Sequence, residues 1–200
     1  MNSKFKTLDL TLGAVFVVLM MIGANIAFWF PAFKITYASG EVPITLQTLF
    51  AILAGLLLGK KLGSFSMLVY LAVGIAGVPV FAEMSAGATA LISPTGGFLL
   101  SFIFVAFISG YIVEKASEPK VNTYLLATFV GLMTNYLIGT PLMYLSLNYI
   151  AEIAISMKAA VISMVPFFIK DFIITLAMAV VLPQFVTRLT KAIPTLASRT

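Results

Sequence analysis

Residues 10–33 read LTLGAVFVVLMMIGANIAFWFPAF, a stretch without a single charged side chain. About 20 apolar residues suffice for a helix to cross a bilayer, so this stretch predicts a membrane-spanning helix. It follows Lys4 and Lys6, as the apolar part of a signal peptide would. However, it is long for a signal peptide and has no small-x-small cleavage site before Trp29, so we interpret it as a retained helix.

Similar stretches follow along the rest of the chain, and only the last is interrupted by charge, at Lys170 and Asp171. They cover Val42 to Gly59, Leu62 to Ala82, Met84 to Val113, Val121 to Ala151 and Ala159 to Thr187. With 61% hydrophobic and 10% charged residues, a water-soluble fold could not cover the apolar surface. The sequence therefore predicts an all-α integral membrane protein, with residues 1–200 forming a single domain of six transmembrane helices.

The basic residues are distributed unevenly between the two sets of loops that six crossings define. With the N-terminus inside, only Lys34 and Lys158 fall in outer loops, apart from the intramembrane Lys170. The cytoplasmic set is Lys4, Lys6, Lys60, Lys61, Lys115, Lys120, Arg188, Lys191 and Arg199. This asymmetry follows the positive-inside rule and predicts a multi-pass protein of the cell membrane with both termini in the cytoplasm. Topology therefore accounts for the net charge of +5 without a nucleic-acid partner.

Several chemistries are excluded by what the chain lacks. It has no cysteine and no histidine, so disulfides, thiolate or imidazole metal sites and histidine-based proton transfer are absent. The segment from Gly55 to Lys61 is no phosphate-binding loop, because three residues rather than four separate Gly55 from Gly59 and Lys60 precedes another lysine. We expect no metal, no cofactor and no ATP binding by this chain.

Interruptions of the helical pattern gather at the outer side. The loop Pro31 to Pro43 is long for a helix connection and could act as a lid, with the next helix starting at Pro43. Regular helix should end within Gly74 to Ala82, before the Gly-rich connection Glu83 to Pro94, and Gly139 to Pro141 should break the fifth helix. Irregular backbone at membrane depth is tolerated where it lines a cavity, so we expect a polar-lined ligand pocket open to the outside.

Lys170 and Asp171 need a specific reason to lie within a span, because each costs roughly 2.5 to 3.5 kcal/mol at the bilayer centre. Adjacent helical residues point about 100° apart, so we expect each side chain to address a different partner rather than the other. The pair fits a ligand site, and the alternative is structural pairing between helices or snorkelling to the headgroups. Further polar residues of the outer half are Gln47, Thr45, Asn135, Thr95 and Tyr144. Such a pocket suits a small amphipathic anion with a separate polar head.

Five motifs in order carry a family resemblance. They are VPITLQ at 42–47, AGLLLG at 54–59, GVPVFA at 77–82, PTGGFL at 94–99 and PFFIKD at 166–171. The chain resembles the BioY family, the biotin-binding S components of energy-coupling-factor (ECF) vitamin transporters. The resemblance implies a non-enzymatic subunit that captures biotin outside the cell. It would deliver biotin with a coupling module of one transmembrane protein and two ATPases, so ATP would be used by the partners.

The resemblance also suggests roles for individual residues. Asp171 would accept the ureido N–H groups, Lys170 would neutralise the valerate carboxylate, and Gln47 and Asn135 would add hydrogen bonds. The apolar rings would lie under Phe81 and Tyr144, and the PTGG motif adds Thr95, Gly96 and Gly97. Some relatives carry a lysine where this chain has Ile174. The docking face of helix 1 would comprise Gly13, Ala14 and Val18, although the family often has a small residue at the position of Val18.

There are three alternatives to this function, of which only the enzyme differs in class. The chain could be an S component for another vitamin, or a solitary biotin transporter that works without ATPases. An intramembrane enzyme using Asp171 as acid or base is disfavoured, because an aspartyl protease needs a second carboxylate.

Overall fold

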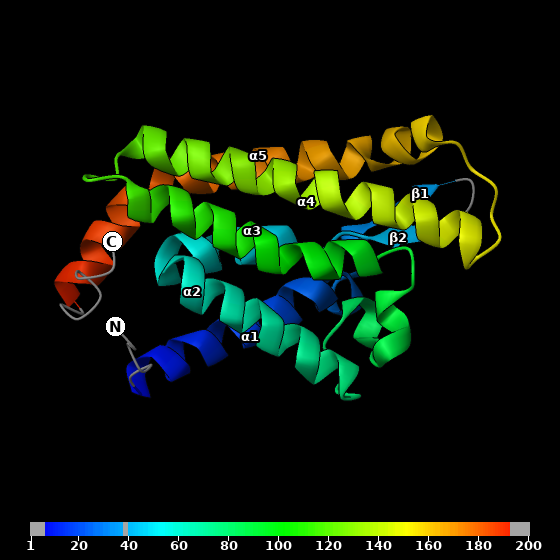
Figure 1. Ribbon diagram of the computed structural model, residues 1–200, viewed down its shortest axis with the longest axis horizontal. Coiled ribbons are helices and arrows are strands. Elements are labelled where there is room, and N and C mark those ends of the chain that lie inside the picture. The colour runs from blue at the N-terminus through cyan, green and yellow to red at the C-terminus, as the bar shows by residue number, and fades with distance from the viewer. Residues whose placement is uncertain (1–6, 38–39, 193–200) are drawn as a thin grey trace.

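The computed structural model describes residues 7–37 and 40–192. Five long helices make up a bundle that is elongated along the long axis of the molecule (Figure 1). They are α1 (Thr7–Trp29), α2 (Gln47–Ile75), α3 (Gly96–Lys115), α4 (Val121–Tyr149) and α5 (Met157–Ala192). By length and composition, each of the five could cross a membrane, and an integral membrane fold fits the chain.

Helix α2 is interrupted at Gly59, whose φ of 77° and ψ of 170° are not helical. This backbone conformation is essentially restricted to glycine. The chain reverses there, because Gly63 lies against the backbone of Ala54 and Gly55 on the preceding half of α2. In a straight helix, Ala54 and Gly63 would be about 13 Å apart along the axis and could not touch. Thus α2 comprises two helical halves joined by a tight turn.

The expected loop after α1 contains regular structure. A 3-10 turn at Pro31–Phe33 leads into the antiparallel pair β1 (Lys34–Tyr37) and β2 (Gly40–Pro43), in which Lys34 pairs with Pro43. The expected helix start at Pro43 is therefore wrong, because Pro43 ends β2 and α2 begins at Gln47. Whether this hairpin covers a ligand stays a prediction.

The connection between α2 and α3 is irregular, as expected, with 3-10 turns at Ala82–Met84 and Ala88–Leu91. The expected break in the fifth helix is wrong, since α4 continues through Gly139, Thr140 and Pro141 to Tyr149. A proline removes one backbone donor from a helix, and neighbouring helices can compensate for that loss.

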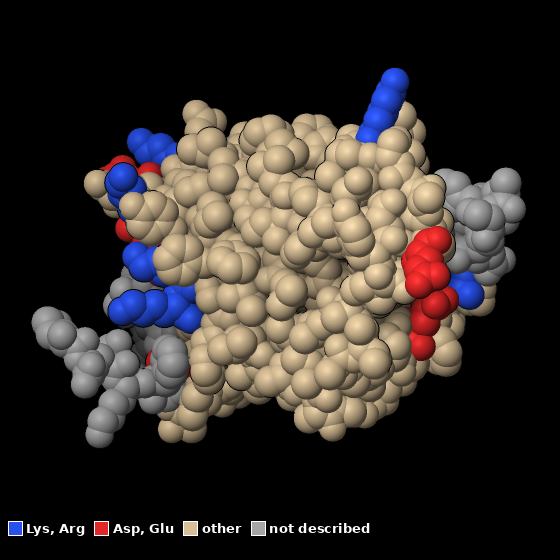
Figure 2. Space-filling view, turned by 45° about the vertical axis from the view of Figure 1, so that its right-hand side comes forward, with Lys and Arg blue, Asp and Glu red and all other residues tan. Residues whose placement is uncertain are grey.

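The most extensive contact between two helices joins α2 to α3. At Gly55 a side chain would collide with the backbone of Ala106 on α3, so glycine permits the two helices to approach closely. Outward faces of the helices are apolar and exposed, for example at Val18, Leu137 and Val181. Charged residues gather at the two ends of the face in Figure 2, Lys and Arg mostly at the left and Asp and Glu at the right. The uncharged middle is the surface that a bilayer would cover.

Candidate functional site

The charged pair of α5 lies inside the helix bundle. Asp171 shares the buried stripe of α5 with Thr175, one turn further, and with Ala179, and only 5% of its surface is exposed. Its Oδ1 lies 2.6 Å from the Nζ of Lys170. The expectation that adjacent residues could not pair is therefore wrong, because the long lysine side chain bends back toward the carboxylate.

Each member of the pair also contacts another helix or loop, which agrees with the rest of that expectation. Lys170 Nζ donates a hydrogen bond to the backbone oxygen of Thr45, at 2.6 Å, just before α2 begins. Asp171 Oδ2 accepts hydrogen bonds from the hydroxyl groups of Thr48 (3.0 Å) and Tyr136 (2.8 Å). The carboxylate thus joins α5 to α2 and α4, with three donors directed at its two oxygens.

A chain of buried hydrogen bonds continues from this carboxylate to α3. Asn135 donates from Nδ2 to the hydroxyl oxygen of Thr48 at 3.2 Å, and Ser101 donates to Asn135 Oδ1 at 2.6 Å. Each donor in this chain has an acceptor, so the polar groups are satisfied within the apolar bundle. The predicted residues Asp171, Lys170 and Asn135 therefore belong to one network, which Thr45 joins through its backbone.

Gln47 lies next to Thr48 at the start of α2 but belongs to a separate set of contacts. Its Nε2 donates to the hydroxyl of Tyr70 at 3.0 Å, and that hydroxyl donates to the backbone oxygen of Val80 at 2.9 Å. Phe81 packs edge-on against the Tyr70 ring, with centroids 5.5 Å apart, and its ring fills the space beside Gly74. Phe81 is thus buried behind Gln47 and Tyr70 and braces them.

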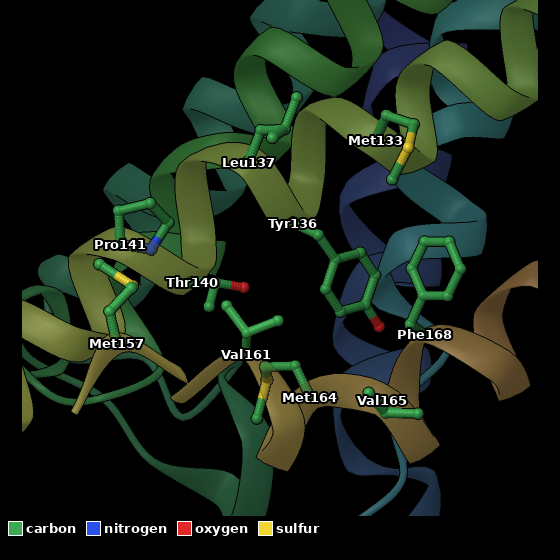
Figure 3. Close-up of a pocket in the computed structure, with 10 residues that line it drawn as sticks. All are labelled: Met133, Tyr136, Leu137, Thr140, Pro141, Met157, Val161, Met164, Val165 and Phe168. Carbon is green, nitrogen blue, oxygen red and sulfur yellow. The ribbon is translucent and has the colours of Figure 1, made fainter. Parts of the chain in front are cut away.

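An open pocket of about 370 Å³ lies between α4 and α5, and part of its lining, such as Leu137, also belongs to the exposed apolar surface of the bundle. Its volume is within the range of pockets that hold small molecules. From α4 it is lined by Met133, Tyr136, Leu137, Thr140 and Pro141, and from α5 by Met157, Val161, Met164, Val165 and Phe168. In Figure 3 the Tyr136 ring extends from α4 toward α5, where its hydroxyl lies beside Phe168. Because that hydroxyl binds Asp171, the apolar cavity adjoins the charged pair.

The structure brings four of the predicted residues into neither the Asp171 network nor the contacts of Gln47 and Tyr70. Thr95 is exposed at the start of α3, where its hydroxyl contacts that of Ser93 at 3.0 Å. Gly96 packs on the backbone of Leu91, and Gly97 packs against Leu142 of α4. Tyr144 is half-buried on α4, two turns beyond Tyr136.

Four residues of the two networks were not predicted: Thr48, Ser101, Tyr136 and Tyr70. Two of them adjoin predicted residues in the sequence, because Thr48 follows Gln47 and Tyr136 follows Asn135. The hydroxyls of Ser101 and Tyr70 stand in apolar spans, where a polar group needs a partner. Only the packing of the helices shows which partner each one has.

Of the three residues predicted to dock a partner, two face outward. Ala14 and Val18 are exposed on α1, whereas Gly13 is buried against Ser66 of α2. Within residues 7–37 and 40–192, no three His, Cys, Asp or Glu side chains gather into a group that could hold a metal ion.

The model of the BioY family matches residues 1–191. The chain belongs to the BioY family. It is 35% identical to the putative biotin transporter BioYB of Bacillus subtilis over 94% of this chain and 92% of that protein. The probable biotin transporter BioY of Pyrococcus horikoshii is 36% identical over 90% of this chain and 96% of its own length. These BioY relatives are transporters and not enzymes, so the prediction that the chain is no enzyme is confirmed.

A solved structure supports the same relationship. The fold matches the crystal structure of the S-component for biotin from an ECF-type ABC transporter, with a TM-score of 0.68 and 26% identity. The match covers 96% of this chain and 95% of the other. The family resemblance noted from the five sequence motifs is thereby confirmed.

Proposed function

We propose that this chain is the biotin-binding S component of an ECF transporter, which captures biotin outside the cell and delivers it for ATP-driven uptake. The observation that carries this proposal is the ion pair of half-buried Lys170 with buried Asp171, held between α2, α4 and α5 beside an apolar pocket. A buried ion pair in a bilayer is costly, and the membership in a family with biotin transporters supplies a reason for it.

The chemical groups of biotin match the groups of the site. The ureido N–H groups are donors for the remaining lone pairs of Asp171, and the valerate carboxylate is an acceptor for Lys170. Asn135 and Gln47 add hydrogen bonds, and the rings occupy the apolar cavity next to Tyr136. In this proposal Tyr144 covers the rings, Phe81 supports Gln47 through Tyr70, and Thr95, Gly96 and Gly97 shape the entrance.

The cavity also offers a route to the charged pair. It extends from Met157, at the start of α5, to Phe168, two residues before Lys170. The start of α5 lies at the end of the bundle that carries β1 and β2 (Figure 1). A ligand that enters at this end would therefore reach Asp171 along one face of α5.

We propose six membrane crossings, because the two halves of α2 form a hairpin at Gly59. An even number agrees with the start of α1 and the end of α5 lying at the same end of the bundle (Figure 1). The end of α3, Lys115, lies at this end (Figure 1), and Lys60 lies near it, because both lysines approach the Tyr111 ring. By the positive-inside rule, this end would lie in the cytoplasm of the cell and the pocket on the outer side. Lys4, Lys6 and Arg199, which supported this orientation, lie outside the described residues.

Uptake would need partner subunits, because a nucleotide-binding loop is absent from the sequence. The partners are a transmembrane coupling protein and two ATPases, and the chain itself needs no cofactor. Ala14 and Val18 on the exposed face of α1 form the proposed docking surface. Gly13 is buried beneath this surface and would not contact a partner directly.

The binding proposal is tested with purified protein and two ligands, biotin and biotinamide, which lacks the carboxylate charge. Lys170→Ala should reduce the affinity for biotin at least tenfold and affect biotinamide much less, because only the acid pairs with the ammonium group. Asp171→Asn should weaken both ligands. Lys158→Ala, on the first turn of α5, is the matched control. Unchanged affinity in both site variants would remove the pair from the binding site.

Two further measurements separate the alternatives. Uptake of labelled biotin should depend on co-expression of a coupling module, and uptake by the chain alone would support a solitary transporter. Competition by other vitamins should fail to displace biotin, and effective displacement would identify another substrate.

A further inference from the structure

Two lysines share one aromatic ring at the end of the bundle that carries the Gly59 turn. The Nζ of Lys60 lies 5.1 Å from the centre of the Tyr111 ring, and the Nζ of Lys115 lies 5.8 Å from it. Both distances are within the range of cation–π attraction. The ring therefore holds two ammonium groups near each other, from two different helices.

This group carries an excess of positive charge. Glu114 is engaged with Lys60, accepting its backbone N–H at 2.8 Å and pairing with its Nζ at 3.0 Å. In the described part of the chain, no carboxylate forms an ion pair with Lys115, which is an exposed residue. The two ammonium groups share one carboxylate, so the cluster keeps one unbalanced positive charge that a further negative group could neutralise.

An exposed aromatic strip begins at the same ring and runs along α3. Phe104, Phe107 and Tyr111 are 52%, 45% and 42% exposed, and their spacing places them on one helical face. The rings of Phe107 and Tyr111 are stacked, with centroids 6.4 Å apart and planes 5° apart. Because α3 is a membrane-competent helix, this strip faces the acyl region while the lysines lie at headgroup level.

We propose that Lys60, Tyr111 and Lys115 bind the phosphate of an anionic phospholipid, whose acyl chain lies along Phe107 and Phe104. The arrangement matches the two parts of such a lipid, an anionic head next to a hydrocarbon tail. A free phosphate would use the lysines alone and would leave the strip unexplained. Lys60 lies at the opposite end of the first half of α2 from Thr48, which binds Asp171, so this proposal is independent of what the central site binds.

The test compares binding of phosphatidylglycerol and phosphatidylcholine to the purified full chain, measured by native mass spectrometry. The double variant Lys60→Gln/Lys115→Gln should lose about 25-fold in affinity for phosphatidylglycerol, about fivefold per lysine, and should bind phosphatidylcholine as before. The control is Lys34→Gln/Lys158→Gln, which removes the same charge at the opposite end of the bundle. The single variant Lys115→Gln spares the pair of Lys60 with Glu114 and should lose about fivefold.

Three results would overturn the proposal. One is an equal affinity of the wild-type protein for the two lipids, and another is an unchanged affinity in Lys115→Gln and in the double variant. The third is displacement of the lipid by millimolar glycerol phosphate, which would show a site for soluble phosphate. If lipid binding is unchanged while association with a protein partner is lost, the surface is a protein interface instead.

Discussion

Asp171 is the residue at which three helices meet. It accepts hydrogen bonds from Thr48 of α2 and Tyr136 of α4 and pairs with Lys170 of its own helix. An ionised carboxylate inside a bilayer needs such donors, because water cannot solvate it there. The same donors hold its oxygens in fixed positions, which favours a preorganised ligand site.

Tyr136→Phe should show how much this arrangement depends on one hydroxyl. The variant keeps the ring that packs against Phe98 and Phe168 and removes only the donor to Asp171. Hydrogen bonds to charged groups contribute about 2 kcal/mol, so the free energy of unfolding should fall by about that amount. We also expect biotin affinity to fall about tenfold. Thermal unfolding and biotin titration measure the two effects.

Tyr149→Phe is the matched control, because Tyr149 is 76% exposed at the end of α4. It should leave both stability and binding unchanged. If Tyr136→Phe behaved in the same way, the hydroxyl would have no role in positioning Asp171.

At the scale of the elements, the turn within α2 decides the path of the chain. Gly59 has a backbone conformation that other residues avoid, and a side chain there would meet the carboxylate of Glu114. Glu114 in turn accepts the N–H of Lys60, the first donor of the second half of α2. The turn and its cap thus come from two different helices.

Gly59→Ala should lower the free energy of unfolding by about 1 to 3 kcal/mol, the cost of a strained backbone conformation. The midpoint of thermal unfolding measures this effect. Ser64→Ala, one turn further along α2, serves as the control and should have a small effect. A Gly59→Ala midpoint equal to that of Ser64→Ala would show that the turn tolerates a side chain.

At the scale of the whole molecule, charge and helix direction agree about orientation. The end with the Gly59 turn also holds the connection between α3 and α4, and Lys and Arg gather mostly at one end of the face in Figure 2. The connection between α4 and α5, which contains Glu152, lies at the other end. We therefore expect Glu118 in the cytoplasm and Lys158 outside.

The absence of cysteine from the chain permits a direct test of this orientation. Single variants Lys158→Cys and Glu118→Cys are exposed to a membrane-impermeant maleimide in intact cells. Lys158→Cys should be labelled, whereas Glu118→Cys should react only after the membrane is opened. The reverse pattern would show that the protein has the opposite orientation in the membrane. Labelling of both sites in intact cells would rule out six crossings.

Much of the fold and part of the site could be predicted from the sequence. The apolar stretches anticipated the long helices, and the cost of burying Lys170 and Asp171 identified them as the residues that need partners. The five motifs identified the family. These features depend on composition and local spacing, which a single chain displays without folding.

Only the tertiary structure decided which side chains meet. It joined Asp171 to Thr48 and Tyr136, buried Phe81 beside Tyr70, and left Thr95 exposed. It also showed that Lys170 bends back to Asp171 and that α4 continues through Pro141. The reason is that hydrogen bonds between helices depend on how each helix is rotated about its axis and on the depth at which neighbours meet. The length of an apolar stretch does not distinguish between these arrangements, because the same stretch can pack with any rotation about its axis and at different depths.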